Sequence, residues 1–600
     1  MFFRTKTVRG TPVLQLVESF RNSEGLPRQR VLASLGDASV PIDERGAIAK
    51  AVELRLRGEE SLFPARLSRV GAEWVVRIQK IAEHSKAAPL ALGTSRLDGV
   101  MVERIRTDDV VGFGPHVVAL KAWETLGLSA ILSELGMESE RIAIAQLMVI
   151  NRLIEPLSEW ALIDWSNRTA LPEMLGVVVT KTTKDRLYRT SDEILKIRRK
   201  IEKELRCGEQ ELFSLRRSIV LYDVTNTHFE GLCQSNPKAK HGKNKQKRND
   251  CRQVAVGMAF DEHGFALAHE VFEGNIADTK TLLSMLDRLD LGDEGLKPVV
   301  ILDAGFASEE NIRFLEERGC SYLINVTRSS RTRYAESFAN ETFSPLPGRK
   351  ADKQVEVKRI ADPDNENRRL VLCRSAQRRE KEQAMISTAE TRFLADGESL
   401  RQRIEKGRLK KPDVIERKIG AFMKKHPRVA RFYKVEHKDH SLHLIRNDEK
   451  LDEALALCGD YVLKTDKTLD AETLWELYMT LLEAEKGFRM LKSTLGLRPN
   501  FHQLEKRVDG HIFISVLAYH LLRWIGYRLE TAGDPREWRT LRRLLGTHVI
   551  ATTRLPLEDG REVSIRKPSQ PDAEQERVYA LLGIDWKRAY PPRKTELKKR

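Results

Sequence analysis

The 600-residue sequence predicts a multidomain α/β protein built on a mixed five-stranded sheet with flanking helices. Its length exceeds what a single hydrophobic core normally fills, so several domains are expected. Between residues 213 and 327, short apolar runs and amphipathic helical segments follow one another in the order βββαβαβ. Helical periodicity dominates before this stretch, and charged segments with short β-like runs follow it.

The first 212 residues divide into two expected parts. Residues 1–60 read as a small β-hairpin unit and a linker helix, because apolar and polar positions alternate on both sides of the Gly25-Leu26-Pro27 turn. Residues 61–212 have helical periodicity, and we expect an all-helical region there.

The sheet is predicted from five apolar runs. The first, Ser218–Asp223, is followed by two runs around the turn "DEHG", which indicates an antiparallel hairpin. Two helix-linked runs ending near Asp303 and Val326 complete the set. Because β-α-β crossovers are right-handed, the first and fourth strands become parallel neighbours, as in the ribonuclease-H type of fold.

The remaining boundaries follow changes in composition. Residues 328–470 are rich in charge and read as an inserted domain of mixed β and helix. Residues 471–530 return to the sheet domain with a strong helix, Asp470–Ser493, for which Asp470 is the expected N-cap. Residues 531–600 are expected to form a C-terminal helical region and a basic tail.

Charge favours a polyanionic partner. Lys and Arg number 103 against 87 Asp and Glu, a formal charge of +16, which favours nucleic acid. The six cysteines are scattered, so neither a disulfide framework nor a zinc site is indicated, and a reducing cytoplasm fits. The longest apolar stretch, His511–Tyr527, is interrupted by His520 and Arg523 and reads as a buried helix, so no membrane association is expected.

Two carboxylates are expected to meet at one edge of the sheet. Asp223 and Asp303 each end an apolar run, and parallel neighbouring strands bring their carboxyl ends to the same edge. Two carboxylates this close repel each other unless a cation lies between them, and Mg²⁺ prefers oxygen ligands of this kind.

The helix 470–493 offers a third carboxylate. At about 100° per residue, Tyr478, Glu485 and Lys492 fall on one face, and Glu485 is expected within the apolar stripe. A Glu in a packing face needs a partner, which a metal ion held by the two aspartates would supply. Glu483, on the opposite face, is expected to be solvated. Lys492, about 10 Å further along with Arg489 near it, suits a passing phosphate backbone.

The order strand-Asp223, strand-Asp303, helix-Glu485 resembles the DDE transposases of bacterial insertion sequences. The helix resembles their Y-(2)-R-(3)-E-(6)-K signature, with Leu481 in place of the arginine. The segments "LYDVTNTHFEG", "ILDAGFASEENI" and "FRMLKSTLGLRP" also look like one branch of this group, whose members carry a β-rich insertion before the Glu helix.

The resemblance implies a ribonuclease-H-like catalytic domain with Asp223, Asp303 and Glu485 as metal ligands and catalytic residues. It implies two Mg²⁺ ions, for which Mn²⁺ can substitute, and double-stranded DNA as partner. The reaction would be cleavage at the terminal inverted repeats and joining of the 3′-hydroxyl ends to target DNA. Residues 61–212 would bind the DNA ends, and a homodimer or higher oligomer would pair them in the bacterial cytoplasm, on the nucleoid.

A basic segment lies between the first two predicted strands. Residues 238–252 hold seven basic side chains against one acid and read either as a solvated loop or as a DNA contact, which we favour. The residues expected to contact DNA are Tyr478, Arg489, Lys492, Lys243, Lys245, Lys247, Arg248 and Arg252. Asn226 and His228 read either as substrate contacts or as turn caps.

Two other function classes remain. One is a catalytically inactive DNA-end-binding protein derived from a transposase, against which the three intact carboxylates argue. The other is a phosphohydrolase of the aspartyl-phosphate type, since "LYDVT" resembles its strand-terminal motif, but Thr225 stands where that motif needs a second Asp.

Overall fold

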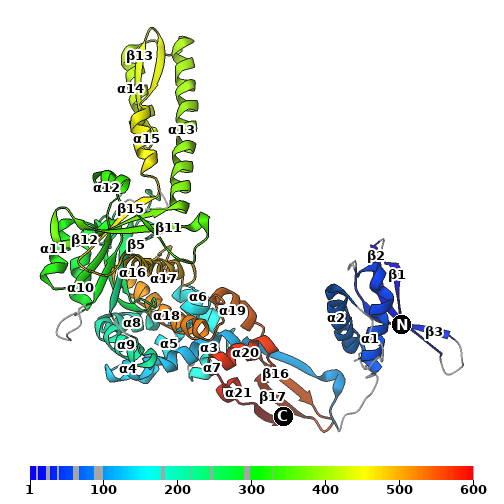
Figure 1. Cartoon of the computed structure of the whole chain (residues 1–600). Coiled ribbons are helices and arrows are strands. Elements are labelled where there is room, and N and C mark those ends of the chain that lie inside the picture. Colours follow the sequence, from blue (N-terminus) through cyan, green and yellow to red (C-terminus); the bar gives the residue numbers. More distant parts are fainter. Residues whose placement is uncertain are drawn as a thin grey trace. The chain divides into compact units, whose positions relative to one another are not determined.

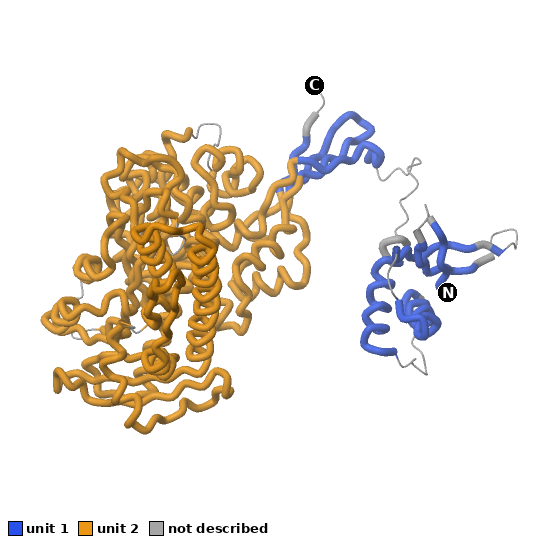
Figure 2. Tube along the Cα trace, turned by 90° about the horizontal axis from the view of Figure 1, so that it is seen from above, with its two compact units in different colours: residues 1–108, 552–566, 593–600 blue, residues 109–551, 567–592 orange. Residues whose placement is uncertain are grey.

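The computed structural model describes residues 1–8, 11–21, 27–36, 40–57, 67–86, 99–176, 183–215, 218–242, 248–289, 298–327 and 329–598. The chain divides into two compact units (Figure 2). Unit 1 holds residues 1–108, 552–566 and 593–600, and unit 2 holds residues 109–551 and 567–592. None of the described helices is long and apolar enough to cross a membrane.

The N-terminal part of unit 1 is a three-stranded antiparallel sheet with two helices. The strands β1 (Phe2–Val8), β2 (Thr11–Arg21) and β3 (Pro27–Ser34) lie in the order β1-β2-β3. The predicted hairpin is thus present as β2 and β3, and β1 adds a strand to it. The helices α1 (Arg45–Arg57) and α2 (Arg69–Lys86) enclose a small core with the sheet.

The first part of unit 2 is helical. Its helices are α3 (Gly114–Thr125), α4 (Leu128–Glu134), α5 (Ser139–Ile154), α6 (Glu159–Ser166), α7 (Leu171–Leu175), α8 (Lys184–Lys196) and α9 (Arg198–Phe213). Of these, α3, α5 and α8 pack against α18 (Glu505–Thr531). The stretch predicted as a buried helix lies in α18, where His520 meets Glu209 at 2.6 Å.

The centre of unit 2 is a nine-stranded sheet in the order β10-β11-β12-β15-β9-β8-β5-β6-β7. The five predicted strands are β5 (Ile219–His228), β6 (Gln253–Phe260), β7 (Ala266–Glu273), β8 (Val299–Leu302) and β9 (Ser321–Asn325). They lie side by side, with β5, β6 and β7 antiparallel and β5, β8 and β9 parallel. The helices α10 (Leu282–Leu289) and α11 (Glu309–Glu317) connect β7 to β8 and β8 to β9.

The expected limit of five strands was wrong. Four more strands continue the sheet beyond β9: β15 (Asp460–Thr465), β12 (Asn365–Ser375), β11 (Val355–Asp362) and β10 (Ser344–Pro345). The reason is that β15 pairs antiparallel with β9, which would otherwise leave an open edge of backbone donors and acceptors. The short helix α12 (Ala335–Asn340) packs near this extension.

A helical projection leaves the sheet between β12 and β15 (Figure 1). It consists of α13 (Ala376–Glu405), α14 (Pro412–Lys425), the hairpin β13 (Tyr433–Lys438) and β14 (Ser441–Arg446), and α15 (Asp448–Ala456). Phe393, Phe422, Tyr433 and Leu442 belong to its own hydrophobic core. The segment 328–470 therefore contributes strands to the main sheet as well as this projection.

The expectation of a helical C-terminal region was right only in part. Besides α19 (Trp538–Leu545), α20 (Ala573–Leu581) and α21 (Trp586–Ala589), the chain forms β16 (Val549–Pro556), β17 (Arg561–Pro568) and β18 (Arg593–Lys598). With β4 (Arg106–Gly112) these strands make a sheet in the order β18-β17-β16-β4. The reason is visible in "VIATTRLP" and "REVSIRKP", whose β-branched residues favour a hairpin.

A buried ionic cluster fastens α9 and α10 to β7. The Glu202 carboxylate contacts the His269 imidazole and the Arg288 guanidinium, and the His269 backbone N–H donates to Glu202 at 3.1 Å. Burial alone would raise the pKa of Glu202, but the His269 and Arg288 charges and the His269 hydrogen bonds outweigh it and hold this pKa below its ordinary value.

We predict that Glu202→Ala lowers the free energy of unfolding by about 3–5 kcal/mol, because it leaves the Arg288 charge buried without this partner. Since the folded-state pKa of Glu202 is depressed, this contribution is present above about pH 4 and is lost as the pH falls through the folded value. Urea unfolding at pH 7 and at low pH measures both effects.

The matched control is Glu204→Ala, two residues along on the exposed side of α9. It should change stability by less than about 0.5 kcal/mol. Equal losses for the two variants would show that the buried cluster does not stabilise the unit.

Candidate active site

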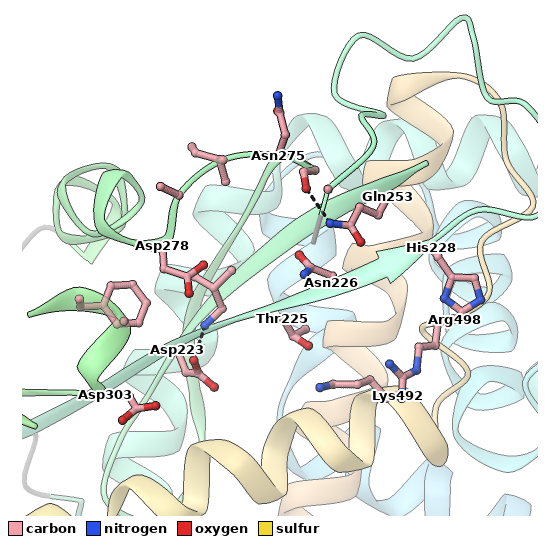
Figure 3. A pocket seen from close by; sticks show the side chains of 17 residues that line it. Asp223, Thr225, Asn226, His228, Gln253, Asn275, Asp278, Asp303, Lys492 and Arg498 are labelled. Atoms are coloured by element: carbon pink, nitrogen blue, oxygen red, sulfur yellow. Dashed lines mark hydrogen bonds between the residues drawn. The ribbon is translucent and has the colours of Figure 1, made fainter. Parts of the chain in front are cut away.

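The register of β5 and β8 brings Asp223 and Asp303 together. The last pair of this parallel ladder is Tyr222 with Leu302, and each aspartate is the next residue along its strand direction. Both carboxylates therefore lie where the parallel pair ends (Figure 3). Asp223 is half-buried and Asp303 is exposed.

The expectation that a strand ends on Asp223 was wrong. β5 is ten residues long and continues to His228, because β6 pairs with it from Leu221 to His228 after β8 has ended. Asn226 and His228 consequently lie within a strand.

A cavity of about 810 Å³ opens at this end of the parallel pair. Its lining includes the predicted residues Asp223, Asp303 and Lys492 (Figure 3). Asn226 and His228 line it as well. A cavity of this size, lined by both acidic and basic side chains, can hold a charged segment of substrate.

Two tyrosine hydroxyls lie close enough to the aspartates for the carboxylates to shift their pKa. Burial raises the pKa of Tyr222 above its ordinary value, and the neighbouring carboxylates of Asp223 and Asp278 raise it further. Burial also raises the pKa of Tyr478, and Asp303 adds to that shift. Tyr478, predicted to contact DNA, is thus half-buried near Asp303. Both phenols stay neutral at physiological pH.

The predicted helix 470–493 consists of two helices. Asp470 caps the first, α16 (Ala471–Met479), by accepting the Thr473 N–H at 2.9 Å, as predicted. The second, α17 (Leu481–Ser493), begins after Thr480 and packs against β5.

The expectation that Glu485 is embedded in an apolar stripe was wrong. The buried residues of α17 are Leu481, Ala484, Gly487, Phe488 and Leu491, and Glu485 is exposed beside them. At about 100° per residue, Glu485 lies roughly 100° away from the centre of this buried face, which is why its side chain reaches solvent. Glu483 is partly exposed and forms an ion pair with Lys486 at 2.5 Å.

Glu485 nevertheless lies on the face of α17 that carries Lys492. Seven residues complete almost two turns, so the two positions differ by about 20° and lie about 10 Å apart along the axis. The Lys492 side chain lines the cavity and its ammonium lies 5.5 Å from the Phe488 ring centre. Glu485 itself does not line the cavity, and within the described ranges no group of three His, Cys, Asp or Glu side chains could hold a metal ion.

The predicted basic contacts are placed only in part. Arg489 is exposed on α17. Arg248 pairs with Asp250 at 3.0 Å and with Glu230 at 3.7 Å, and Arg252 donates to the Ala239 carbonyl at 3.4 Å. Lys243, Lys245 and Lys247 lie outside the described residues. A DNA contact by this segment therefore stays a prediction.

Sequence reasoning missed several cavity residues. Asn275 and Asp278 come from the loop after β7, and Arg498 follows α17. The Gln253 amide donates to the Gly274 carbonyl at 2.7 Å and so fixes the start of that loop. The available signal is the polar stretch "EGNIADT", which directly follows a predicted strand and contains Asp278. Asp278 begins a 3-10 turn, Asp278–Lys280.

Comparison with known proteins identifies the class. A family model described as "Transposase DDE domain" matches residues 214–521, just over half of the chain. The chain therefore belongs to the DDE transposase family, and its function class is DNA transposition. The match contains Asp223, Asp303 and Glu485.

Among solved structures, a piggyBac transposase in a synaptic complex with hairpin DNA is similar at 11% identity and a TM-score of 0.34. The similarity covers 68% of this chain and 70% of that one. No curated protein matches the sequence.

We predict that Gly257→Ala impairs the site without touching an aspartate. A Cβ on Gly257 would lie 2.5 Å from the Tyr222 hydroxyl and 2.9 Å from Phe272, so Tyr222 would have to move next to Asp223. Such overpacking costs about 1–3 kcal/mol of stability. Thermal unfolding and a DNA nicking assay measure the two effects.

Gly208→Ala is the control, because nothing lies within 4 Å of its added Cβ and it stands in α9. It should stabilise the protein by about 0.5–1 kcal/mol. If Gly257→Ala behaves in the same way, Tyr222 does not constrain the site.

Proposed function

We propose that the protein is an insertion-sequence transposase that cleaves DNA phosphodiesters at its terminal inverted repeats and joins the 3′-hydroxyl ends to target DNA. The catalytic residues would be Asp223, Asp303 and Glu485 on a ribonuclease-H-like core. The supporting observation is the β5–β8 register, which sets two of the three carboxylates side by side in a cavity within the matched family domain.

The two aspartates fit a divalent cation by the chemistry of their donor atoms. Carboxylate oxygens at the edge of a sheet are ligands that Mg²⁺ and Mn²⁺ accept. Asp223 and Asp303 would hold the metal, and Glu485 would complete the set from α17. When bound, a pair of such ions activates a water or a 3′-hydroxyl and stabilises the leaving oxygen of the phosphodiester.

The chain's own residues would bind and orient the DNA around the carboxylates. Lys492 and Arg498 line the same cavity as the aspartates, so their cationic groups can hold phosphates next to the scissile one. Arg489 is exposed on the same helix as Lys492 and would extend this contact. Tyr478 would support the site by packing near Asp303.

The basic segment from Lys238 to Arg252 precedes β6, and β6 pairs with the strand that carries Asp223. We therefore retain it as a DNA contact, with residues 61–212, which hold strand β4 besides their helices, as the part that recognises the DNA ends. Two or more copies would pair the two ends, in the cytoplasm of a bacterium. The net charge of +16 is consistent with such a partner.

The first test is metal-dependent nicking of a labelled duplex that carries the element's own end. Wild type should nick in Mg²⁺ or Mn²⁺ and not in EDTA, and Asp223→Ala should nick at least about 10³-fold more slowly, because it loses several kcal/mol of charge stabilisation. DNA binding should be retained. Binding without any nicking by the wild type would favour the inactive DNA-binding protein, and full activity of Asp223→Ala would refute the assignment.

The second test asks whether Glu485 is the third catalytic carboxylate. Glu485→Gln should abolish nicking to a similar extent, whereas Glu483→Gln, two residues away on the same helix, should stay within about 2-fold of wild type, since it only releases the exposed Lys486 pair. Both variants remove one charge and keep the side-chain shape. If the two have equal effects, Glu485 has no special role.

A further inference from the structure

Asn325 lies in the same row of the sheet as the two aspartates. The last residue pairs of the β5–β8 ladder and of the β8–β9 ladder both contain Leu302. The residues that follow this row on the three parallel strands are Asp223, Asp303 and Asn325. Asn325 is therefore the neighbour of Asp303 on the side away from Asp223.

This row faces the helix that carries Tyr478. Side chains alternate along a strand, so the row shares its face of the sheet with the residues two positions earlier, Leu221, Ile301 and Leu323. Those three belong to the same hydrophobic cluster as Leu474 and Trp475 of α16. α16 also packs against β9. Asn325 and Tyr478 thus come from two elements that are in contact.

Asn325 is a buried polar residue in an apolar strand. Its side chain is 7% exposed, and its amide oxygen has no hydrogen-bond partner within the described residues. Burial raises the pKa of Tyr478, Asp303 raises it further, and a hydrogen bond with the Asn325 side chain opposes both. A hydrogen bond that lowers the pKa of a phenol is donated to its oxygen, so the Asn325 amide nitrogen is the donor.

The two aspartates differ in how their carboxylates are held. An Asp223 oxygen accepts the Val224 N–H at 2.8 Å. Asp303 is the N-cap of the 3-10 turn Ala304–Phe306, but its side chain accepts no N–H of that turn. The backbone therefore sets the position of Asp303 and leaves the orientation of its carboxylate to other partners. Because Asn325 donates to the Tyr478 oxygen, the phenol keeps its own proton to donate to a carboxylate.

We propose that Asn325 is a positioning residue of the metal site, a role that rests on the proposed function for the metal ion itself. Asn325 holds the Tyr478 hydroxyl, and that hydroxyl donates to the Asp303 carboxylate and fixes its orientation. Asn325 does not line the active-site cavity, so it acts through Tyr478 and touches neither the ion nor DNA. Removing such a partner of a ligand lowers metal affinity by about 10–100-fold.

The test measures Mn²⁺ binding by the full chain without DNA, from the electron paramagnetic resonance signal of the free ion. The Mn²⁺ that wild type binds and Asp223→Ala does not bind defines the site. Asn325→Leu keeps the side-chain volume and removes the amide, so it should weaken Mn²⁺ binding at this site at least about 10-fold.

The matched control is Asn151→Leu on α5. Asn151 is 1% exposed, and within the described residues its amide nitrogen has no hydrogen-bond partner. It lies outside the active-site cavity, so its replacement should change Mn²⁺ affinity less than about 2-fold. Equal losses in the two variants would overturn the proposal.

Tyr478→Phe tests the route from Asn325 to Asp303. This variant removes only a hydroxyl, so it keeps the proposal testable if Asn325→Leu fails to fold. It should weaken Mn²⁺ binding at least about 10-fold, and the double variant should bind as tightly as Tyr478→Phe alone, because the two residues act in series. Losses that multiply in the double variant, or a wild type without the Asp223-dependent Mn²⁺, would overturn the proposal.

The Mg²⁺ dependence of nicking gives a second readout. In Asn325→Leu the Mg²⁺ concentration for half-maximal nicking should rise at least about 10-fold, while the rate at saturating Mg²⁺ stays within about 3-fold of wild type. A lower maximal rate with an unchanged Mg²⁺ requirement means that Asn325 has only a structural role, and it overturns the proposal.

Failure of this proposal is distinguishable from failure of the proposed function. Nicking by the wild type, with Mn²⁺ affinity unchanged in Asn325→Leu, refutes only the positioning role. Asp223-dependent Mn²⁺ binding that Asn325→Leu weakens, without any nicking by the wild type, refutes only the transposase assignment.

Discussion

The parallel pairing of β5 with β8 is the constraint on which the active-site arrangement depends. These strands are separated in sequence by the β6–β7 hairpin and α10, and only their ladder sets the two aspartates side by side. A slip of one residue would move every side chain of β5 to the opposite face of the sheet. The ladder is secured from both sides, since β6 pairs along the rest of β5 and β9 pairs with β8.

The backbone fixes the side-chain positions of Glu485 and Lys492 less closely than those of the two aspartates. α17 packs on β5, with Leu481, Ala484, Phe488 and Leu491 among its buried residues, and Glu485 lies on its exposed side. A carboxylate on a solvated face can change rotamer at little cost, whereas the two aspartates follow a fixed backbone. The structure thus separates two carboxylates that the backbone sets side by side from a third one whose position depends on its side chain.

Local chemistry made part of this structure predictable. Asp470 is recognisable as an N-cap because a side-chain oxygen before an amphipathic run can accept a backbone N–H of the first turn, and the structure confirms this bond. The alternation of strands and helices from 218 to 326 predicted the right neighbours, since crossover handedness leaves few alternatives.

Non-local pairing defeated the other predictions. The runs "KQVEVKRI" and "RRLVLCRS" carry no local signal that they extend the sheet that begins at β5. The reason is that β12 joins this sheet through β15, which is distant in sequence. No Gly or Pro marks the break at Thr480, so the sequence predicts one continuous helix that contains Glu485.

The points where the projection leaves and rejoins the sheet determine how its length can vary. The chain leaves β12 after Ser375 and re-enters β15 at Asp460, and Arg374 and Asp460 are direct partners in the ladder. The exit and entry points are thus neighbours, and the Arg374 guanidinium meets the Asp460 carboxylate there at 3.2 Å. Because the projection begins and ends at one residue pair of the ladder, its length can change while the pairing of the strands stays the same. Insertions and deletions in the projection can therefore occur without moving the strands that carry Asp223 and Asp303.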